Sequence, residues 1–298
     1  RLSKANGIIL MTTYLAITLG TATAGIIKDY FGSGGSGNAG GDLALGELYL
    51  AQGALVLLAV LGTLSALGVR RAPVADPGVE LKGKIFGELK TTLKAIFKDR
   101  LFCSVALTYA YFWGLGAALL MLCNAYGKIL MGLDDSSTSM LLVFLSVGIA
   151  LGAFGGSLVS KGKVDFRIYR TGLVLLLLSM LALGWTHQDL QLQAWTIDRI
   201  HAARATLFLL GFAGGMFALP LQTSIQLWSP GDLRGRVMAG VNFLCFLSIF
   251  LFSGVFWAAR EIAGKDGIEW IGAGLGCLTV IVHLLARSGL ARAEEKLS

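Results

Sequence analysis

Six amide side chains lie inside long apolar stretches of this sequence: Asn6, Gln52, Asn124, Gln222, Gln226 and Asn242. A polar group in hydrocarbon must find a hydrogen-bonding partner or line a cavity, so each is a candidate for a substrate pathway. Hydrogen bonds that only hold helices together would explain the same residues. Gln222 and Asn242 are the strongest candidates, because they lie on consecutive stretches joined by a tight turn and Pro220 loosens the helix beside Gln222.

Other kinds of chemistry lack their motifs. From Leu101 onward no charged residue lies near the middle of an apolar stretch, and no phosphate-binding GxxxxGK[ST], HExxH or GxSxG motif occurs. The cysteines have no metal-ligand spacing. The basic residues lie in short loops between apolar stretches, which argues against nucleic acid as a partner. We therefore expect no enzymatic activity, no catalytic residues, no metal and no cofactor.

The elements that position the amides are membrane spans. The chain has 298 residues, 55% of them hydrophobic and 14% charged, and its mean hydropathy is +0.71. Crossing a bilayer takes a helix of about 20 apolar residues. The sequence predicts an all-α, multi-pass membrane protein with eight spans at residues 6–27, 46–69, 101–126, 139–160, 171–185, 205–227, 237–259 and 269–286.

The longest polar interval, residues 70–100, separates the first two spans from the last six. It holds eight Lys or Arg residues and four Asp or Glu residues. Its apolar side chains at Leu81, Ile85, Leu89, Leu93 and Phe97 have helical spacing, which predicts a surface helix along the inner leaflet or against the bundle. The predicted domains are residues 1–69, the central cytoplasmic segment 70–100, and a six-span bundle with a short tail at 101–298.

Basic residues are retained on the cytoplasmic side during insertion, and this bias orients the spans. With the central segment inside, nineteen of the 25 Lys and Arg residues lie on the cytoplasmic side and six on the other. This orientation places both ends of the chain in the cytoplasm.

Small residues four positions apart occur in three spans: Gly148, Gly152 and Gly156, then Gly211 and Gly215, then Gly272 and Gly276. This spacing lets helix backbones approach closely in lipid.

Charged residues cluster in two of the cytoplasmic turns: Lys161 and Lys163 in one, and Asp232, Arg234 and Arg236 in the other. They are candidates for closing the cytoplasmic side through ion pairs, or for anchoring the turns to anionic lipid. In the second turn, Ser229 is placed to cap the start of the next helix, with Pro230 at its first position and Asp232 favouring the positive end of its dipole.

The second turn and its two spans resemble a known family. The residues Pro220-Leu221-Gln222, Gln226, the run 229–239 and Asn242-Phe243 are similar to the tenth and eleventh spans of the major facilitator superfamily, and more narrowly to its lysophospholipid transporters, some of which are fused to a phospholipid acyltransferase and acyl-ligase. The segments 4–7 and 132–135, with Ser139, resemble other parts of that branch. The family has six plus six spans, so the resemblance implies that the first four are missing from this chain. Ser160, followed by Lys161, Gly162 and Lys163, replaces the family's usual acidic residue, which puts a charge relay at that turn in doubt.

The resemblance implies a secondary transporter that works by alternating access and moves lysophospholipid across a bacterial inner membrane. Its expected partners are membrane lipids, the lysophospholipid or another amphiphilic substrate, and a fused or associated acyltransferase. Two alternatives stay open: a facilitator of another amphiphilic or small organic solute, and a non-transporting membrane scaffold for a fused acyltransferase.

Overall fold

The computed structural model describes residues 2–32, 45–69, 85–161, 163–184, 186, 190–192, 195–229, 233–264 and 267–297. Within these ranges helices dominate, with one short β-hairpin. The elements are α1 (Leu2–Gly32), α2 (Leu45–Leu67), α3 (Ile85–Lys98), α4 (Arg100–Ala125), the π-helical turn η1 (Tyr126–Leu130), α5 (Asp135–Val159), α6 (Phe166–Leu183), β1 (Leu190–Leu192), β2 (Trp195–Ile197), α7 (Arg199–Trp228), α8 (Arg234–Ala263) and α9 (Ile268–Leu297).

The helices agree with the predicted spans. Seven of them, α1 and α4 to α9, are long and apolar enough to cross a membrane, while the described apolar part of α2, Leu55–Leu67, is shorter. The fifth span begins earlier than residue 171, because Asp165 caps α6 and accepts a hydrogen bond from the Arg167 backbone N–H at 2.8 Å. The fold is therefore an all-helical membrane bundle.

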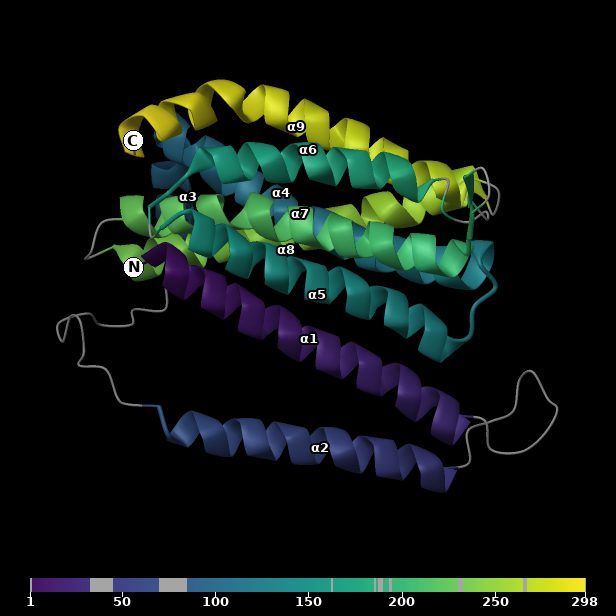
Figure 1. Cartoon of the computed structure of the whole chain (residues 1–298). Coiled ribbons are helices and arrows are strands. Elements are labelled where there is room, and N and C mark those ends of the chain that lie inside the picture. The colour runs from purple at the N-terminus through teal and green to yellow at the C-terminus, as the bar shows by residue number, and fades with distance from the viewer. Residues whose placement is uncertain are drawn as a thin grey trace.

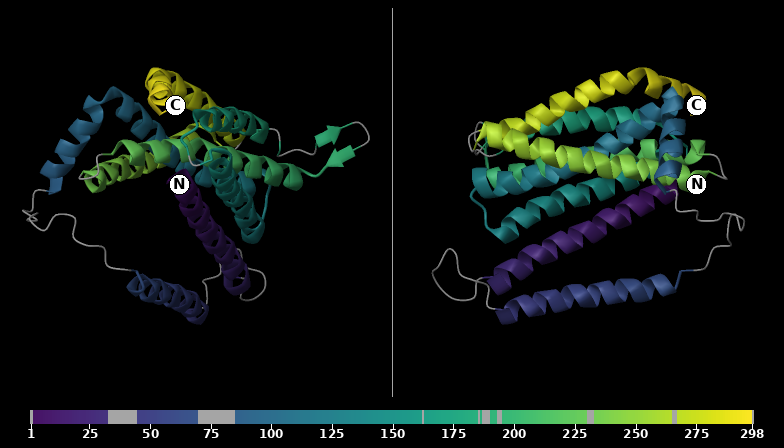
Figure 2. Two further views of the ribbon diagram at one scale, coloured as in Figure 1. Left: turned by 60° about the vertical axis from the view of Figure 1, so that its left-hand side comes forward. Right: turned by 180° about the vertical axis from the view of Figure 1, so that it is seen from behind.

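The long helices run side by side (Figure 1). Helix α5 packs between α1 and α7, α7 packs against α6, and α4 packs against α8 and α9. Helix α2 lies beside α1 at the edge, and its described side chains are exposed. The antiparallel hairpin of β1 and β2 projects from the bundle (Figure 2). Of the first two helices, α1 is therefore the one that packs against the last six.

Helices α5 and α7 approach each other closely at glycine residues. A Cβ atom added at Gly148 or Gly152 of α5 would lie closer than 3.0 Å to a backbone oxygen of α7, and one at Gly211 or Gly215 of α7 would lie equally close to a backbone oxygen of α5. The predicted close approach is confirmed for these four residues. We call them the glycine seam.

The glycines of the last span behave differently. A Cβ atom at Gly272 or Gly276 of α9 would lie 3.5 Å or more from its nearest neighbour, which is ordinary van der Waals contact. Helix α6 therefore lies in contact with this face through Met180, but an alanine would fit at either position. The spacing of small residues permits a closer approach here without the packing making use of it.

Helix α3 crosses the end of the bundle at a steep angle to the long helices (Figure 2). It packs against α4 and α8, where Ile96 is buried and Thr92 lies against Gly240. Phe86, in contrast, is 87% exposed. The amphipathic helix predicted for this segment is confirmed from Ile85 onward, and its first predicted residues lie outside the described ranges.

Candidate functional site

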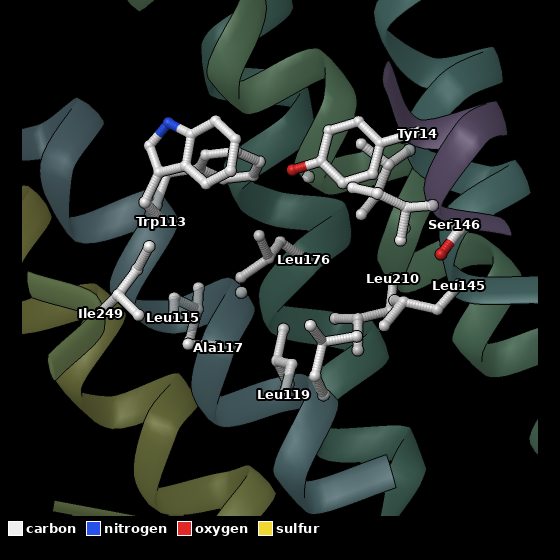
Figure 3. A pocket seen from close by; sticks show the side chains of 17 residues that line it. Tyr14, Trp113, Leu115, Ala117, Leu119, Leu145, Ser146, Leu176, Leu210 and Ile249 are labelled. Atoms are coloured by element: carbon white, nitrogen blue, oxygen red, sulfur yellow. The ribbon is translucent and has the colours of Figure 1, made fainter. Parts of the chain in front are cut away.

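A cavity of about 220 Å³ lies in the middle of the bundle, among α1, α4, α5, α6, α7 and α8 (Figure 3). Its lining is almost entirely apolar, and the polar side-chain groups in it are the Tyr14 hydroxyl, the Trp113 indole N–H and the Ser146 hydroxyl. The lining residues are Tyr14, Ile17, Phe112, Trp113, Leu115, Gly116, Ala117, Leu119, Leu120, Leu145, Ser146, Ile149, Leu176, Leu210, Gly211, Gly214 and Ile249. We call it the central cavity.

Two aromatic rings border the central cavity. Tyr14 of α1 and Trp113 of α4 stack with ring centroids 6.5 Å apart and planes inclined by 20°. Figure 3 shows both rings on the same side of the cavity. Because these residues come from opposite sides of the polar segment 70–100, the cavity lies where the two parts of the chain meet.

The absence of a side chain at Gly116 helps to keep the central cavity open. A Cβ atom added there would find no atom within 4 Å, although Gly116 lines the cavity. The first carbon of a larger side chain would therefore enter open space beside the cavity, which makes Gly116 a useful position for testing what the cavity holds.

A second, more open cavity of about 630 Å³ adjoins the central cavity at the end of the bundle where α4 and α8 finish. The two cavities share Ile17 and Leu120. Asn124, Lys128 and Arg260 supply the polar lining of this second cavity. We call it the mouth cavity.

Two acidic residues stand beside the mouth cavity on the loop and first turn of α5. The Lys128 ammonium pairs with the Asp135 carboxylate at 2.5 Å. Asp134 caps α5, where the side-chain and backbone hydrogen bonds from Ser137 hold the pKa of its carboxyl below the ordinary value. The positive charge of Lys128 is thus partly balanced.

Among the predicted pathway residues, Asn6 makes a contact between helices. It is buried, and its Nδ2 donates to the Thr223 Oγ1 at 3.3 Å, which ties α1 to α7. Gln222, beside Thr223, is half-buried, and its Oε1 is shielded from solvent with no hydrogen-bonding partner. An unsatisfied carbonyl in this setting needs a partner that the described residues do not supply.

The other predicted pathway residues are spread over the bundle. Asn124 lines the mouth cavity and is the only one of the six that lines either cavity. Gln52 on α2 and Asn242 on α8 are exposed, and Gln226 is half-buried near the end of α7. The structure therefore does not bring the six amides together in one site.

The predicted cytoplasmic cluster lies where α5 ends and α8 begins. Lys161, Lys163, Arg234 and Arg236 are exposed, and no ion pair joins them to another described residue. Asp232 lies outside the described ranges. Both proposed roles of this cluster stay predictions: closing the cytoplasmic side through ion pairs, and anchoring the turns to anionic lipid.

The expected helix start at Ser229 is wrong. Ser229 is the last residue bonded to α7, because its backbone N–H and its hydroxyl both donate to the Ile225 carbonyl oxygen, at 3.2 and 2.6 Å, while α8 begins at Arg234 after Leu233. A serine hydroxyl reaches the preceding turn as readily as the following one, so sequence alone does not decide which helix it serves.

At this same end, α1 is fastened to the last six helices. The Ser3 and Ser160 hydroxyls lie 2.7 Å apart and share a hydrogen bond, and Gly7 lies directly against Ser157. Together with the bond between Asn6 and Thr223, these contacts hold α1 against α5 and α7 at the end where α1 begins.

Sequence reasoning missed the residues that line the cavities. Lys128 and Arg260 entered the sequence argument only as two of the six basic residues expected on the non-cytoplasmic side. Because basic residues are scarce on that side, their presence there could have marked them as candidates for a binding site. Tyr14, Trp113 and Ser146 carried no signal of their own, because aromatic and small hydroxyl residues are common throughout the spans.

Comparisons with known proteins identify relatives. A family model described as Major Facilitator Superfamily matches residues 1–253. The proteins named lysophospholipid transporter LplT in Yersinia pestis (strain Pestoides F) and Yersinia pseudotuberculosis serotype O:3 (strain YPIII) are each 23% identical over 228 residues. The match covers 76% of this chain and 49% of each relative, so the chain spans about half the length of the curated relatives that it matches.

Proposed function

The chain belongs to the major facilitator superfamily, and on that basis we propose that the protein is a secondary transporter that moves a lysophospholipid across the membrane by alternating access. The relatives named lysophospholipid transporter support this substrate class. The chain is a multi-pass membrane protein, and because the relatives are bacterial we place it in the bacterial inner membrane.

The observation that carries this proposal is the chemistry of the central cavity. Among the residues that the structure describes, no charged side chain lines it, and its three polar groups are neutral. A small ion entering such a site would lose its hydration without gaining a charged partner, which is unfavourable. An acyl chain needs only apolar contact, and the cavity provides it. The lining thus favours an amphiphile with a single apolar tail over a small organic ion.

The contacts between α1 and the last six helices support alternation between two states. Three contacts, at Ser3, Asn6 and Gly7, hold α1 against α5 and α7 at the end where α1 begins, whereas the central cavity adjoins the mouth cavity at the opposite end. In the orientation expected from the basic residues, the end with these three contacts is cytoplasmic. We propose that opening this end breaks the hydroxyl and amide bonds and that Gln222 then gains a partner from the substrate or a neighbouring helix.

The test uses the full-length protein in liposomes and follows a labelled lysophospholipid between the leaflets by extraction with albumin. Gln222→Ala and Asn242→Ala test the two amides proposed to lie on the pathway. Gly116→Leu fills part of the central cavity. Gly254→Leu is its matched control, because Gly254 lies on an exposed face of α8 with no atom within 4 Å of an added Cβ.

We expect protein-dependent movement that Gly116→Leu and the amide substitutions reduce at equal amounts of folded protein, and that Gly254→Leu leaves unchanged. Absence of movement above protein-free liposomes, from protein shown to be folded, would contradict the proposal. It would favour a facilitator of another solute or a scaffold for an acyltransferase. Association with an acyltransferase stays a prediction, because neither the fold nor the relatives' names bear on it.

A further inference from the structure

We propose that the mouth cavity binds the anionic phosphate of a single-chain phospholipid, chiefly through Arg260, while the acyl chain of the same molecule occupies the central cavity. This inference rests on the proposed function and adds the position and chemistry of the headgroup site. Its first support is the polar lining of the mouth cavity, which in the described part of the chain consists of two cations and one amide, with no acidic residue.

The two cations are not equivalent. Lys128 pairs with Asp135, so part of its charge is already balanced. Arg260 is exposed and makes no ion pair with any other residue in the described part of the chain. A guanidinium group binds phosphate oxygens through two parallel N–H donors, and Asn124 adds an amide donor to the same cavity. Arg260 is therefore the principal phosphate ligand.

The neighbouring positions of the two cavities fit the shape of an amphiphile. Ile17 and Leu120 line both of them, so the apolar space and the charged space meet at these two side chains. A molecule with an anionic group at one end and one apolar chain at the other fills both spaces. Free phosphate would use only the mouth cavity, and an uncharged chain only the central cavity.

The position of Arg260 in the chain agrees with a binding role. It lies at the end of α8 that is expected to face away from the cytoplasm, on the side that holds six of the 25 basic residues. Basic residues at helix ends also reach bulk lipid headgroups without any specific site. The experiment must therefore measure binding in the absence of a bilayer.

Binding is measured with the full-length protein held in an amphipathic polymer, using short-chain lysophosphatidylglycerol, the uncharged monoacylglycerol of equal chain length, and inorganic phosphate as probes. The variants are Arg260→Gln and Arg260→Lys. Arg204→Gln is the matched control, because Arg204 lies near the start of α7, at the same end of the bundle, and lines neither cavity.

We expect Arg260→Gln to weaken binding of lysophosphatidylglycerol about tenfold to a hundredfold, which is typical for loss of a hydrogen bond to a charged group. Monoacylglycerol binding should not change, Arg260→Lys should recover part of the loss, and Arg204→Gln should have no effect. Inorganic phosphate should compete only at concentrations far above those of the lysolipid.

Three results would overturn the headgroup site while leaving the proposed function standing: equal losses for the charged and uncharged probes, no loss with Arg260→Gln, or the same loss with Arg204→Gln. Competition by inorganic phosphate as strong as that by the lysolipid would reassign the site to free phosphate and overturn the lipid assignment. A wild-type protein that is folded but binds no single-chain phospholipid would contradict both the site and the proposed function.

Discussion

The glycine seam between α5 and α7 gives the sharpest test of how this bundle is held together. In Gly152→Ala the new methyl group would lie closer than 3.0 Å to the Phe212 carbonyl oxygen, whereas ordinary contact begins at 3.4 Å. The backbones must therefore separate by at least 0.4 Å, the difference between these two distances. Since the obstacle is backbone, no change of side-chain rotamer can relieve the clash.

The loss of stability comes from the weaker van der Waals attraction between α5 and α7 once they move apart. A radial gap of about 0.5–1 Å forfeits a quarter to a half of each van der Waals attraction along the interface. Packing of this kind replaces the hydrophobic drive between helices in lipid. We expect Gly152→Ala to lower the free energy of unfolding by about 1–3 kcal/mol relative to its control, the usual range for overpacking.

The control is Gly155→Ala on the same helix, where an added Cβ meets no atom within 4 Å. Both substitutions bring the same gain of about 1 kcal/mol in helix propensity, so their difference isolates the steric cost. The measurement is unfolding by sodium dodecyl sulfate in mixed micelles, with Gly215→Ala as the reciprocal variant on α7. Equal stability of Gly152→Ala and Gly155→Ala would refute the packing argument.

Three further outcomes are expected. Asn6→Leu removes the hydrogen bond to Thr223, and a double-mutant cycle with Thr223→Val should give a coupling of about 0.6 kcal/mol, the average for bonds between membrane helices; a coupling near zero would show that the bond adds nothing. Arg170→Gln breaks the two hydrogen bonds that the Arg170 guanidinium donates to the Glu294 carboxylate, at 3.2 and 2.8 Å. The two side chains are 56% and 35% exposed, so the loss in the free energy of unfolding should stay within about 0–1 kcal/mol. The pKa of Asp134 is lower in the folded protein than in the unfolded chain, so its stabilising contribution is present above the unfolded pKa of about 3.9 and is lost as the pH falls through the folded pKa. Asp134→Asn should therefore reduce the fall in melting temperature between about pH 5 and pH 2. A melting temperature with the same pH dependence as that of the wild type would contradict this assignment.

Sequence alone determined the features that depend on local composition. The length of each apolar stretch fixes where a helix crosses hydrocarbon, and the spacing within residues 85–97 fixes an amphipathic helix. The glycines at four-residue spacing on α5 and α7 were also found in this way. These properties belong to a single helix, so its neighbours are not needed to recognise them.

Tertiary structure alone decided which faces of the helices meet. Asn6 bonds to Thr223, 217 positions away, a partner that no spacing along α1 could have indicated. Lys128 and Arg260 come from different helices to line one cavity, and Tyr14 stacks on Trp113 across the polar segment. The reason is geometric: a helix turns every 3.6 residues, and spacing along it shows which residues share a face but not which neighbour that face contacts. In lipid most faces are apolar, so hydrophobicity gives little further guidance, and the packing of the helices decides which polar groups meet.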